Sequence, residues 1–391
     1  MRASALKVAG LFAGIGGLER GLAEAGHETV FACEIDPQAQ AVFRQQFACD
    51  LVSDVRNVRS LPQVDLLAAG FPCQDLSQAG EKVGIAGNNS GLVEEVFRLC
   101  RGAQAPSWVL LENVSYMLRL DKGRAMAHIT ASFEDLGFRW AYRVVDARGF
   151  GVPQRRQRVV FLASKVGEPE TVLFADSAHD PSKLHDAVGP VNPSFLYGFY
   201  WTEGLRGLGW TRDAVPTIKG GSSLGIPSPP AIWNPRTNLI GTPSIRDAER
   251  LQGFPADWTA PADGESGPRN PRWRLVGNAV CVPMAAWIGH RLRDPGQPVV
   301  EPHAMPATGW PIAAAGTRGR RVAFEVSMRA MPHRRLNLKG FLQDPLRPLS
   351  GRASYGFLER AGRAKIHFPD GLLEALGEQV ELSKRAGRAI G

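Results

Sequence analysis

The chain has 391 residues, 44% hydrophobic and 21% charged, with a formal net charge of +8 at neutral pH. Its length allows two or three domains and a core large enough to need no disulfide bonds. No stretch reaches the roughly 20 apolar residues of a membrane-spanning helix, and the first residues lack the layout of a signal peptide, so we expect a cytoplasmic protein that uses no membrane.

The cysteines and the excess positive charge further limit the classes of protein to which the chain can belong. The five cysteines form no Cys-x-x-Cys pair, which argues against a zinc ribbon or a disulfide framework and predicts a reducing compartment and no metal site. Residues 301–391 contain 15 Lys and Arg against 8 Asp and Glu, so this tail carries +7 of the net charge. A basic tail suits the binding of a polyanion such as nucleic acid, but it is equally typical of a solvated surface. The charge alone does not distinguish these two interpretations.

Residues 1–164 alternate short apolar runs with helical patterns. Six runs rich in Val, Leu and Phe, without polar alternation, predict strands buried on both faces: "KVAGLF", "ETVFACEID", "VDLLAAG", "SWVLLENV", "AYRVVDA" and "RVVFLAS". Helical segments between them predict helices that end at Gly26 and Gly137. This order predicts an α/β fold, with a parallel, doubly wound sheet covered by helices on both faces.

After Ser164 the pattern changes. Residues 165–268 are rich in loops, and we expect a smaller, partly β domain there. "GNAVCVPMAAWIGHRL" predicts a buried helix within residues 269–293 that returns to the first domain. Residues 294–391 are predicted to be a linker and a basic C-terminal extension, which binds the backbone of a nucleic acid, extends the smaller domain or mediates assembly.

The first strands carry features typical of a nucleotide-like cofactor site. Gly14, Gly16 and Gly17 lie at a strand–helix junction, where a backbone approaches a ligand closely or simply turns tightly. Their spacing differs from the G-x-G-x-x-G of dinucleotide-binding enzymes. Glu34 ends the second strand, where an acid binds ribose hydroxyls or assists the start of the next helix. Asp54 follows a third short strand, in a position to accept from an adenine amino group.

Two later strand ends carry candidate catalytic groups. Cys73 follows a proline at the carboxyl end of the fourth strand, the edge at which open α/β sheets bind ligands. A cysteine is usually a buried structural residue, but its polar flanks favour a nucleophile. Glu112 ends the fifth strand at the same edge. Arg156 and Arg158 are two apart, so on an extended segment they point to the same side. They either face the same pocket, form a phosphate clamp or belong to an ordinary basic loop.

Six stretches, in order, resemble the motifs of the DNA (cytosine-5)-methyltransferase family: "LFAGIGG", "GFPCQDLS", "LLENV", "GFGVPQRRQRVVF", "RLQGFPADW" and "RLVGNAVCVP". They span residues 11–283, and the ordered set is specific although each motif alone is weak. The resemblance implies a doubly wound mixed sheet of the S-adenosylmethionine-dependent methyltransferases. It also implies a target-recognition domain, inserted before the last two motifs.

The resemblance also implies roles for individual residues. Cys73 matches the nucleophile that attacks carbon 6 of cytosine, which activates carbon 5 for the methyl group of S-adenosylmethionine. Glu112 matches the acid at ring nitrogen 3 and the exocyclic amine, and Arg158 the arginine at the ring carbonyl, with Arg156 in support. The family's cofactor positions fall on Phe12, Gly14, Gly16, Gly17, Leu18, Glu34, Ile35, Asp54 and Asn278.

Two positions depart from the family's pattern. Gly10 stands where many members have an acid, which removes one hydrogen bond on the cofactor side. Ile35 stands where many have an aromatic residue, so it packs on adenine without stacking. We expect both changes to weaken cofactor binding, and neither touches the nucleophile.

A cytosine inside a duplex must be flipped out before it can react in this way. The resemblance therefore implies double-stranded DNA as the substrate of a monomer, with a separate restriction endonuclease as the partner in a bacterial restriction–modification system. The alternative is a solitary, regulatory methyltransferase without a partner nuclease. Candidates for contacts with DNA are Ser77 and Gln78 in a loop over the flipped base, Thr217, Lys219 and Gly220 against the backbone, and Arg236 and Asn238 at base edges.

Other classes fit less well. RNA cytosine methyltransferases share many of these motifs, but their additional Cys-Phe-Thr stretch is absent. Zinc deaminases need H-x-E and P-C-x-x-C, and nicotinamide dehydrogenases need a different glycine spacing. A DNA-binding protein with a decayed methyltransferase fold is not expected to keep Cys73, Glu112 and Arg158 together.

Overall fold

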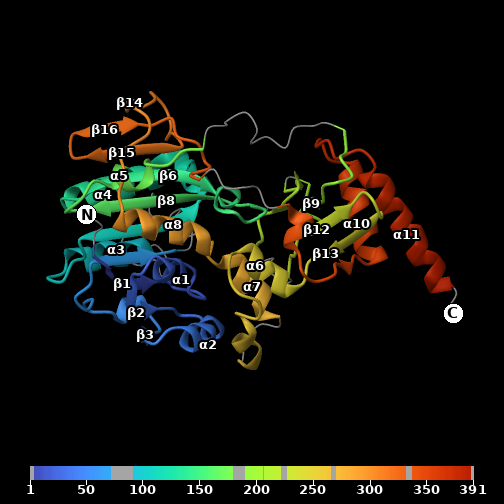
Figure 1. Cartoon of the computed structure of the whole chain (residues 1–391), viewed down its shortest axis with the longest axis horizontal. Coiled ribbons are helices and arrows are strands. Elements are labelled where there is room, and N and C mark those ends of the chain that lie inside the picture. Colours follow the sequence, from blue (N-terminus) through green and yellow to red (C-terminus); the bar gives the residue numbers. More distant parts are fainter. Residues whose placement is uncertain are drawn as a thin grey trace.

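The computed structural model describes residues 4–71, 91–178, 190–205, 207–221, 227–265, 270–331 and 337–388. Figure 1 shows two sheets at opposite ends of an elongated molecule. The larger sheet has helices on both sides, and the smaller one lies beside α10 (Gly351–Gly362) and α11 (Leu372–Arg388). Between the two sheets lie α6 (Ile245–Leu251) and α7 (Pro271–Asn278).

The large sheet contains ten strands in the order β14-β16-β15-β6-β8-β5-β4-β1-β2-β3. All six predicted runs are strands of this sheet, which confirms the prediction. They are β1 (Lys7–Leu11), β2 (Glu28–Cys33), β4 (Leu66–Ala69), β5 (Trp108–Val114), β6 (Arg139–Asp146) and β8 (Gln157–Ser164), and the short β3 (Asp50–Val52) lies at one edge.

The direction of β8 corrects the expectation of an all-parallel sheet. Strands β3, β2, β1, β4 and β5 pair in parallel, whereas β8 runs antiparallel to both β5 and β6. Only residues 147–156 separate β6 from β8. So short a connection returns the chain antiparallel, because a parallel crossover takes about a dozen residues or more. The sheet is therefore mixed, as the family resemblance implies.

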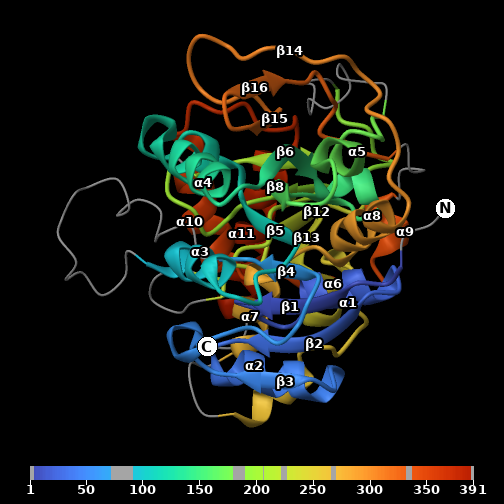
Figure 2. The ribbon, with the colours of Figure 1, turned by 90° about the vertical axis from the view of Figure 1, so that its left-hand side faces the viewer.

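Helices cover both faces of the large sheet (Figure 2). One face packs against α1 (Gly17–Glu24), α5 (Pro169–Leu173) and α8 (Val282–Arg293), and the other against α3 (Leu92–Arg101) and α4 (Arg124–Asp135). Leu110 and Leu111 of β5 point to opposite faces and are both buried, so the strand has no polar alternation. Gly26 and Gly137 close helices with φ of +87° and +80°, as predicted. None of the described helices combines the length and the apolar character that crossing a bilayer requires.

The smaller domain contains the partly β structure that the loop-rich region predicts. Its antiparallel sheet has the order β10-β9-β12-β13-β17. Four strands come from this region, β9 (Tyr197–Phe199), β10 (Trp210–Arg212), β12 (Ala231–Asn234) and β13 (Leu239–Thr242). The chain then passes through α6 and α7 into α8, the predicted return helix. A short parallel pair, β7 (Gln154–Arg155) and β11 (Val215–Pro216), links the two domains.

The C-terminal extension is divided between the two sheets. Its first part forms β14 (His303–Ala304), β15 (Ala313–Thr317) and β16 (Arg320–Ala323), and β15 pairs with β6 at the edge of the large sheet. Its second part forms α9 (Leu338–Phe341), β17 (Arg347–Pro348), α10 and α11, and completes the smaller domain (Figure 1). The tail is thus an integral part of both domains: its second part extends the smaller domain, which is one of the predicted alternatives, and the pairing of its first part with the large sheet was not predicted.

Candidate active site

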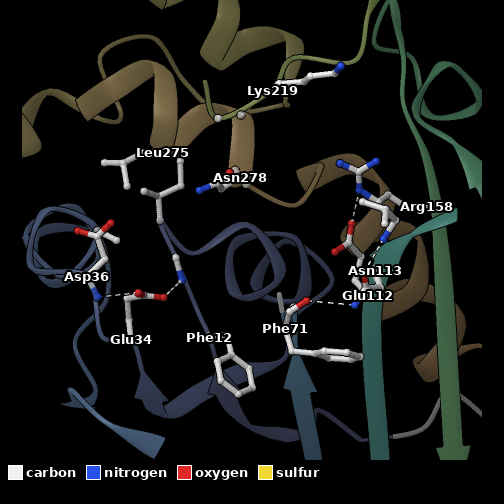
Figure 3. A pocket seen from close by; sticks show the side chains of 18 of the residues that line it. Phe12, Glu34, Asp36, Phe71, Glu112, Asn113, Arg158, Lys219, Leu275 and Asn278 are labelled. Atoms are coloured by element: carbon white, nitrogen blue, oxygen red, sulfur yellow. Dashed lines mark hydrogen bonds and ion pairs between the residues drawn. The ribbon is translucent and has the colours of Figure 1, made fainter. Parts of the chain in front are cut away.

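A pocket of about 1100 Å³ lies between the carboxyl ends of the large sheet and the smaller domain. Phe12, Glu34, Phe71 and Glu112 line it from the sheet side, each at or just beyond the end of a strand. Residues 217–220 and 277–279 line it from the other side. Figure 3 shows Glu34 and Asp36 on one side of this pocket and Glu112 with Arg158 across from them. The sequence predicts this edge of the sheet as the binding edge.

Glu34 holds the glycine loop in place. Its Oε2 accepts from the Gly14 N–H at 2.7 Å, and its Oε1 accepts from the Asp36 N–H at 2.8 Å. Asp36 in turn caps α2 (Pro37–Gln46) by accepting from the Gln38 N–H at 3.0 Å. Burial raises the pKa of Glu34 above its ordinary value. Both predicted roles of Glu34 are thus compatible, because it supports the start of the helix while its carboxylate lines the pocket.

Three of the predicted cofactor residues shape the pocket without lining it. Gly16, the N-cap of α1, has a φ of +84°, and a Cβ there would collide with the ring of Phe47. A Cβ on Gly17 would collide with the carbonyl group of Val280. Leu18 is buried in the core beneath the loop. Gly17 thus allows α1 to approach the segment that leads into α8, and Gly16 leaves room for Phe47.

The other predicted cofactor residues line the pocket. Phe12 has a φ of +55°, and Ile35 is 63% exposed. Asp54 is held by Arg56, whose backbone N–H and guanidinium donate to both carboxylate oxygens at 2.7–3.1 Å. These hydrogen bonds lower the pKa of Asp54. Asn278 ends α7 and lies against Gly220.

Glu112 and Arg158 form an ion pair inside the pocket, with Oε1 and Nε 2.9 Å apart. Both side chains are at least 90% buried. The β5–β8 register pairs Val114 with Arg158, so Glu112 and Arg158 stand diagonally on the same face of the sheet. The two residues that the sequence assigns to one site therefore meet there.

The beginning of the Pro-Cys motif is tied to the same strand. Asn113 is buried, and its Nδ2 donates to the Phe71 carbonyl at 3.1 Å while its Oδ1 accepts from the Val114 N–H at 2.8 Å (Figure 3). Phe71 is the last described residue before the motif's cysteine. Cys73, Ser77 and Gln78 lie outside the described residues.

Arg156 also lines the pocket, although it is only 2% exposed. Its guanidinium donates to the carbonyls of Ile218 at 3.0 Å, Gly277 at 3.2 Å and Ala279 at 2.7 Å. Burial lowers the pKa of this guanidinium. Sequence reasoning places Arg156 beside Arg158 in support of catalysis, whereas the structure directs its donors to backbone from both sides of the domain junction.

The predicted DNA-contacting residues fall into two groups. Thr217, Lys219 and Gly220 line the pocket from the smaller domain. Arg236 and Asn238 lie in the turn between β12 and β13 and are not among the lining residues. The Arg236 Nε donates to the Pro193 carbonyl at 2.9 Å, and the Asn238 Nδ2 donates to Glu378 Oε2 at 3.0 Å. Their polar groups therefore support the smaller domain in this structure.

Sequence reasoning missed Arg56, Asn113 and Tyr200, which also line the pocket. Asn113 directly follows Glu112, and Arg56 lies two residues after Asp54, so both had a local signal. Tyr200 had none, because a loop-rich region gives no periodicity from which to place a side chain. The described part of the chain contains no group of three or more His, Cys, Asp or Glu arranged to hold a metal ion.

Comparisons with known proteins agree with this geometry. A model of the family described as "C-5 cytosine-specific DNA methylase" matches residues 6–191. The chain is 48% identical over 379 residues to the Type II methyltransferase M2.BsuMI of Bacillus subtilis (strain 168), which covers 95% of this chain and 97% of that protein. It is 31% identical over 315 residues to the Type II methyltransferase M.NlaX of Neisseria lactamica, covering 73% and 96%.

A solved structure supports the fold. The S. pombe Dnmt2 methyltransferase matches with a TM-score of 0.52 at 16% identity, over 73% of this chain and 98% of that one. The 48% identity to M2.BsuMI extends through the C-terminal segments that complete both sheets, since it covers nearly the whole chain. The chain therefore belongs to the C-5 cytosine-specific DNA methylase family.

Proposed function

We propose that this protein transfers the methyl group of S-adenosylmethionine to carbon 5 of a flipped-out cytosine in a specific duplex DNA sequence. The observation that carries the proposal is the Glu112–Arg158 ion pair, which lies across one pocket from Glu34. One side of the pocket suits a nucleoside with ribose hydroxyls, and the other suits a polar ring. The Type II names of the relatives further support a restriction–modification setting with a separate nuclease.

The residues around Glu34 fit S-adenosylmethionine, which supplies the methyl group when it is bound. A carboxylate has about four acceptor positions, and two backbone N–H groups use two of those on Glu34. The others remain for two ribose hydroxyls. Phe12 and Ile35 offer apolar surface to adenine. Asp54 can accept from the adenine amino group only if Arg56 releases it, and this ion pair costs little to break because the Arg56 side chain is 58% exposed.

Glu112 and Arg158 fit the cytosine ring. In this mechanism Arg158 donates to the ring carbonyl, and Glu112 shares a proton with ring nitrogen 3 while accepting from the exocyclic amine. Both contacts stabilise the negative charge that develops when a thiolate adds to carbon 6. We assign that thiolate to Cys73, because Asn113 anchors the chain only two residues before it.

The remaining predicted contacts serve DNA. Thr217, Lys219 and Gly220 face the pocket from the smaller domain and would meet the strand from which the base is extruded. Ser77 and Gln78 are proposed to fill the gap that the base leaves. Arg236 and Asn238 would read base edges only after giving up their present partners.

The test is methyl transfer from labelled S-adenosylmethionine to mixed duplex DNA, followed by mapping of the modified base. Wild type should label carbon 5 of cytosine in one sequence context. Cys73→Ala should lose activity by about three orders of magnitude or more while it still binds the cofactor. Transfer to RNA but not to DNA would identify an RNA enzyme. Transfer to neither, by a folded protein that binds the cofactor, would leave a DNA-binding protein with a decayed methyltransferase fold.

A further inference from the structure

The backbone that carries Lys219 is held in one position. The Thr217 Oγ1 donates to a carbonyl of β7 at 2.7 Å, and the Ile218 carbonyl accepts from Arg156 at 3.0 Å. A Cβ on Gly277 would collide with the carbonyl group of Lys219, so α7 packs directly on this segment. The part of Lys219 that can change position is therefore its side chain.

That side chain is bound by two residues that follow β9. The Lys219 Nζ lies 3.0 Å from Glu203 Oε1 and 4.3 Å from the centre of the Tyr200 ring. Lys219 and Tyr200 both line the pocket, and Figure 3 shows Lys219 on the opposite side of the pocket from Glu34 and Phe12. The side chains of Lys219 and Glu203 are 41% and 25% exposed. A carboxylate at the edge of this pocket neutralises the cation that the proposed substrate would need.

Lys219 could serve DNA if its ammonium exchanged Glu203 for a DNA phosphate. Partly exposed ion pairs contribute little free energy, because water screens both charges. A DNA phosphate held at the same place by other contacts can therefore displace a carboxylate, whereas a loosely bound phosphate gains little from the exchange. The Tyr200 ring keeps the ammonium close to the pocket through a cation–π contact.

We propose that Glu203 competes with DNA phosphate for Lys219 and thereby lowers the affinity of the protein for DNA. This inference rests on the proposed function. On the target sequence, the docked recognition domain holds a phosphate near Lys219, and the ammonium moves from Glu203 to it. On other sequences the ion pair persists, and the protein lacks one phosphate contact. Glu203 thus weakens binding to the target by the free energy of the ion pair that must break, and weakens binding to non-target DNA by less, because the phosphate contact that it prevents there is weaker than the ion pair.

The test measures duplex binding by wild type, Glu203→Gln, Lys219→Met and the double variant. An alternating dA–dT duplex contains no cytosine and serves as non-target DNA, and the duplex that wild type methylates serves as the target. Glu203→Gln should tighten binding to the target duplex by about three- to fivefold, the range of a screened ion pair, and tighten binding to the dA–dT duplex by less. In the Lys219→Met background the same substitution should have no effect. Glu374→Gln on α11, an exposed site with the same charge change, is the control.

Three results would overturn the inference. A gain that persists with Lys219→Met, or that Glu374→Gln reproduces, would mean that Glu203 merely repels DNA. An unchanged affinity of Glu203→Gln for both duplexes would mean that Lys219 does not reach a DNA phosphate even when no carboxylate holds it. Failure of the proposed function looks different, because wild type itself would then neither methylate nor bind duplex DNA. Unchanged cofactor affinity and melting temperature in all variants verify that the fold is intact.

Discussion

At the scale of single residues, the buried carboxyl group of Glu19 explains why position 10 is a glycine. Glu19 lies on α1 and is fully buried, and a Cβ on Gly10 would collide with its carboxyl group. The in-register neighbours of Gly10 on β2 and β4 are Ala32 and Ala68. Three small residues therefore leave the space that the carboxyl group fills. The sequence shows that position 10 lacks an acid, but it does not show that Glu19 places a carboxyl group beside it. That placement depends on how α1 packs on the sheet.

The first prediction concerns the pH dependence of stability. Burial raises the pKa of Glu19 from 4.5 to about 8, and its oxygens have no hydrogen-bond partner among the described residues. The folded chain then keeps a proton that the unfolded chain loses above pH 4.5, so stability falls as pH rises from there to about 8. Glu19→Gln, which cannot ionise, should match wild type near pH 5 and exceed it by about 2–4 kcal/mol near pH 8.5 in urea unfolding. Identical pH profiles would contradict this.

The second prediction concerns the fit between Gly10 and Glu19. Gly10→Ala should cost about 1–3 kcal/mol, because the new methyl group overpacks the site. The cost should shrink in a Glu19→Ala background, where the carboxyl group is gone. Gly340→Ala, at a position with open space around the added Cβ, is the control and should change stability little. Equal costs of Gly10→Ala in both backgrounds would show that Glu19 does not occupy this space.

The elements divide into those with a local pattern and those without. The buried runs that form β1, β4 and β5 identify themselves by composition, and so do the motifs that bring Glu112 and Arg158 together. β15 does not, because Ala313–Ala315 has low strand propensity and resembles a linker. These alanines are nevertheless buried against β6. The two-residue β17 has no detectable period at all. Such elements depend on a partner far away in the chain.

The third prediction tests whether α10 completes the smaller domain. Phe357 of α10 is fully buried, with its ring 4.9 Å from that of Phe199 on β9. Phe357→Ala should destabilise this domain by about 3–5 kcal/mol and abolish DNA binding while cofactor binding persists. Tyr355→Ala, an exposed site on the same helix, is the matched control. Hydrogen exchange should show faster opening of β9 and β12 only in the Phe357 variant.

Across the whole molecule, Arg156 joins the two domains. It belongs to the segment between β7 and β8, and its acceptors are the carbonyls at 218, 277 and 279. The carbonyl at 218 belongs to the smaller domain, and those at 277 and 279 belong to the segment that leads into α8. The motif predicted that Arg156 lies near the site, but its three acceptors could not be predicted, because backbone carbonyls leave no trace in a sequence.

The fourth prediction follows from this junction. Arg156→Lys keeps the charge but loses the planar set of donors, and it leaves buried carbonyls unpaired at a cost of about 2–4 kcal/mol. Melting temperature and kcat should fall, while the affinity for S-adenosylmethionine stays near that of wild type. Arg236→Lys, whose exposed guanidinium also binds a carbonyl, is the control. If both variants behave alike, Arg156 does not hold the junction.

The division of the C-terminal extension between the two sheets also sets the order in which the enzyme can be assembled during translation. Chains emerge from the ribosome N-terminus first, and domains fold as units. The strands beneath Glu34 and Glu112 are made early, but β17, α10 and α11 come from residues 347–388, near the end of the chain. A nascent or prematurely terminated chain therefore has the strands beneath the pocket before it has the complete smaller domain. If the smaller domain recognises DNA as proposed, the growing chain acquires the choice of a sequence last.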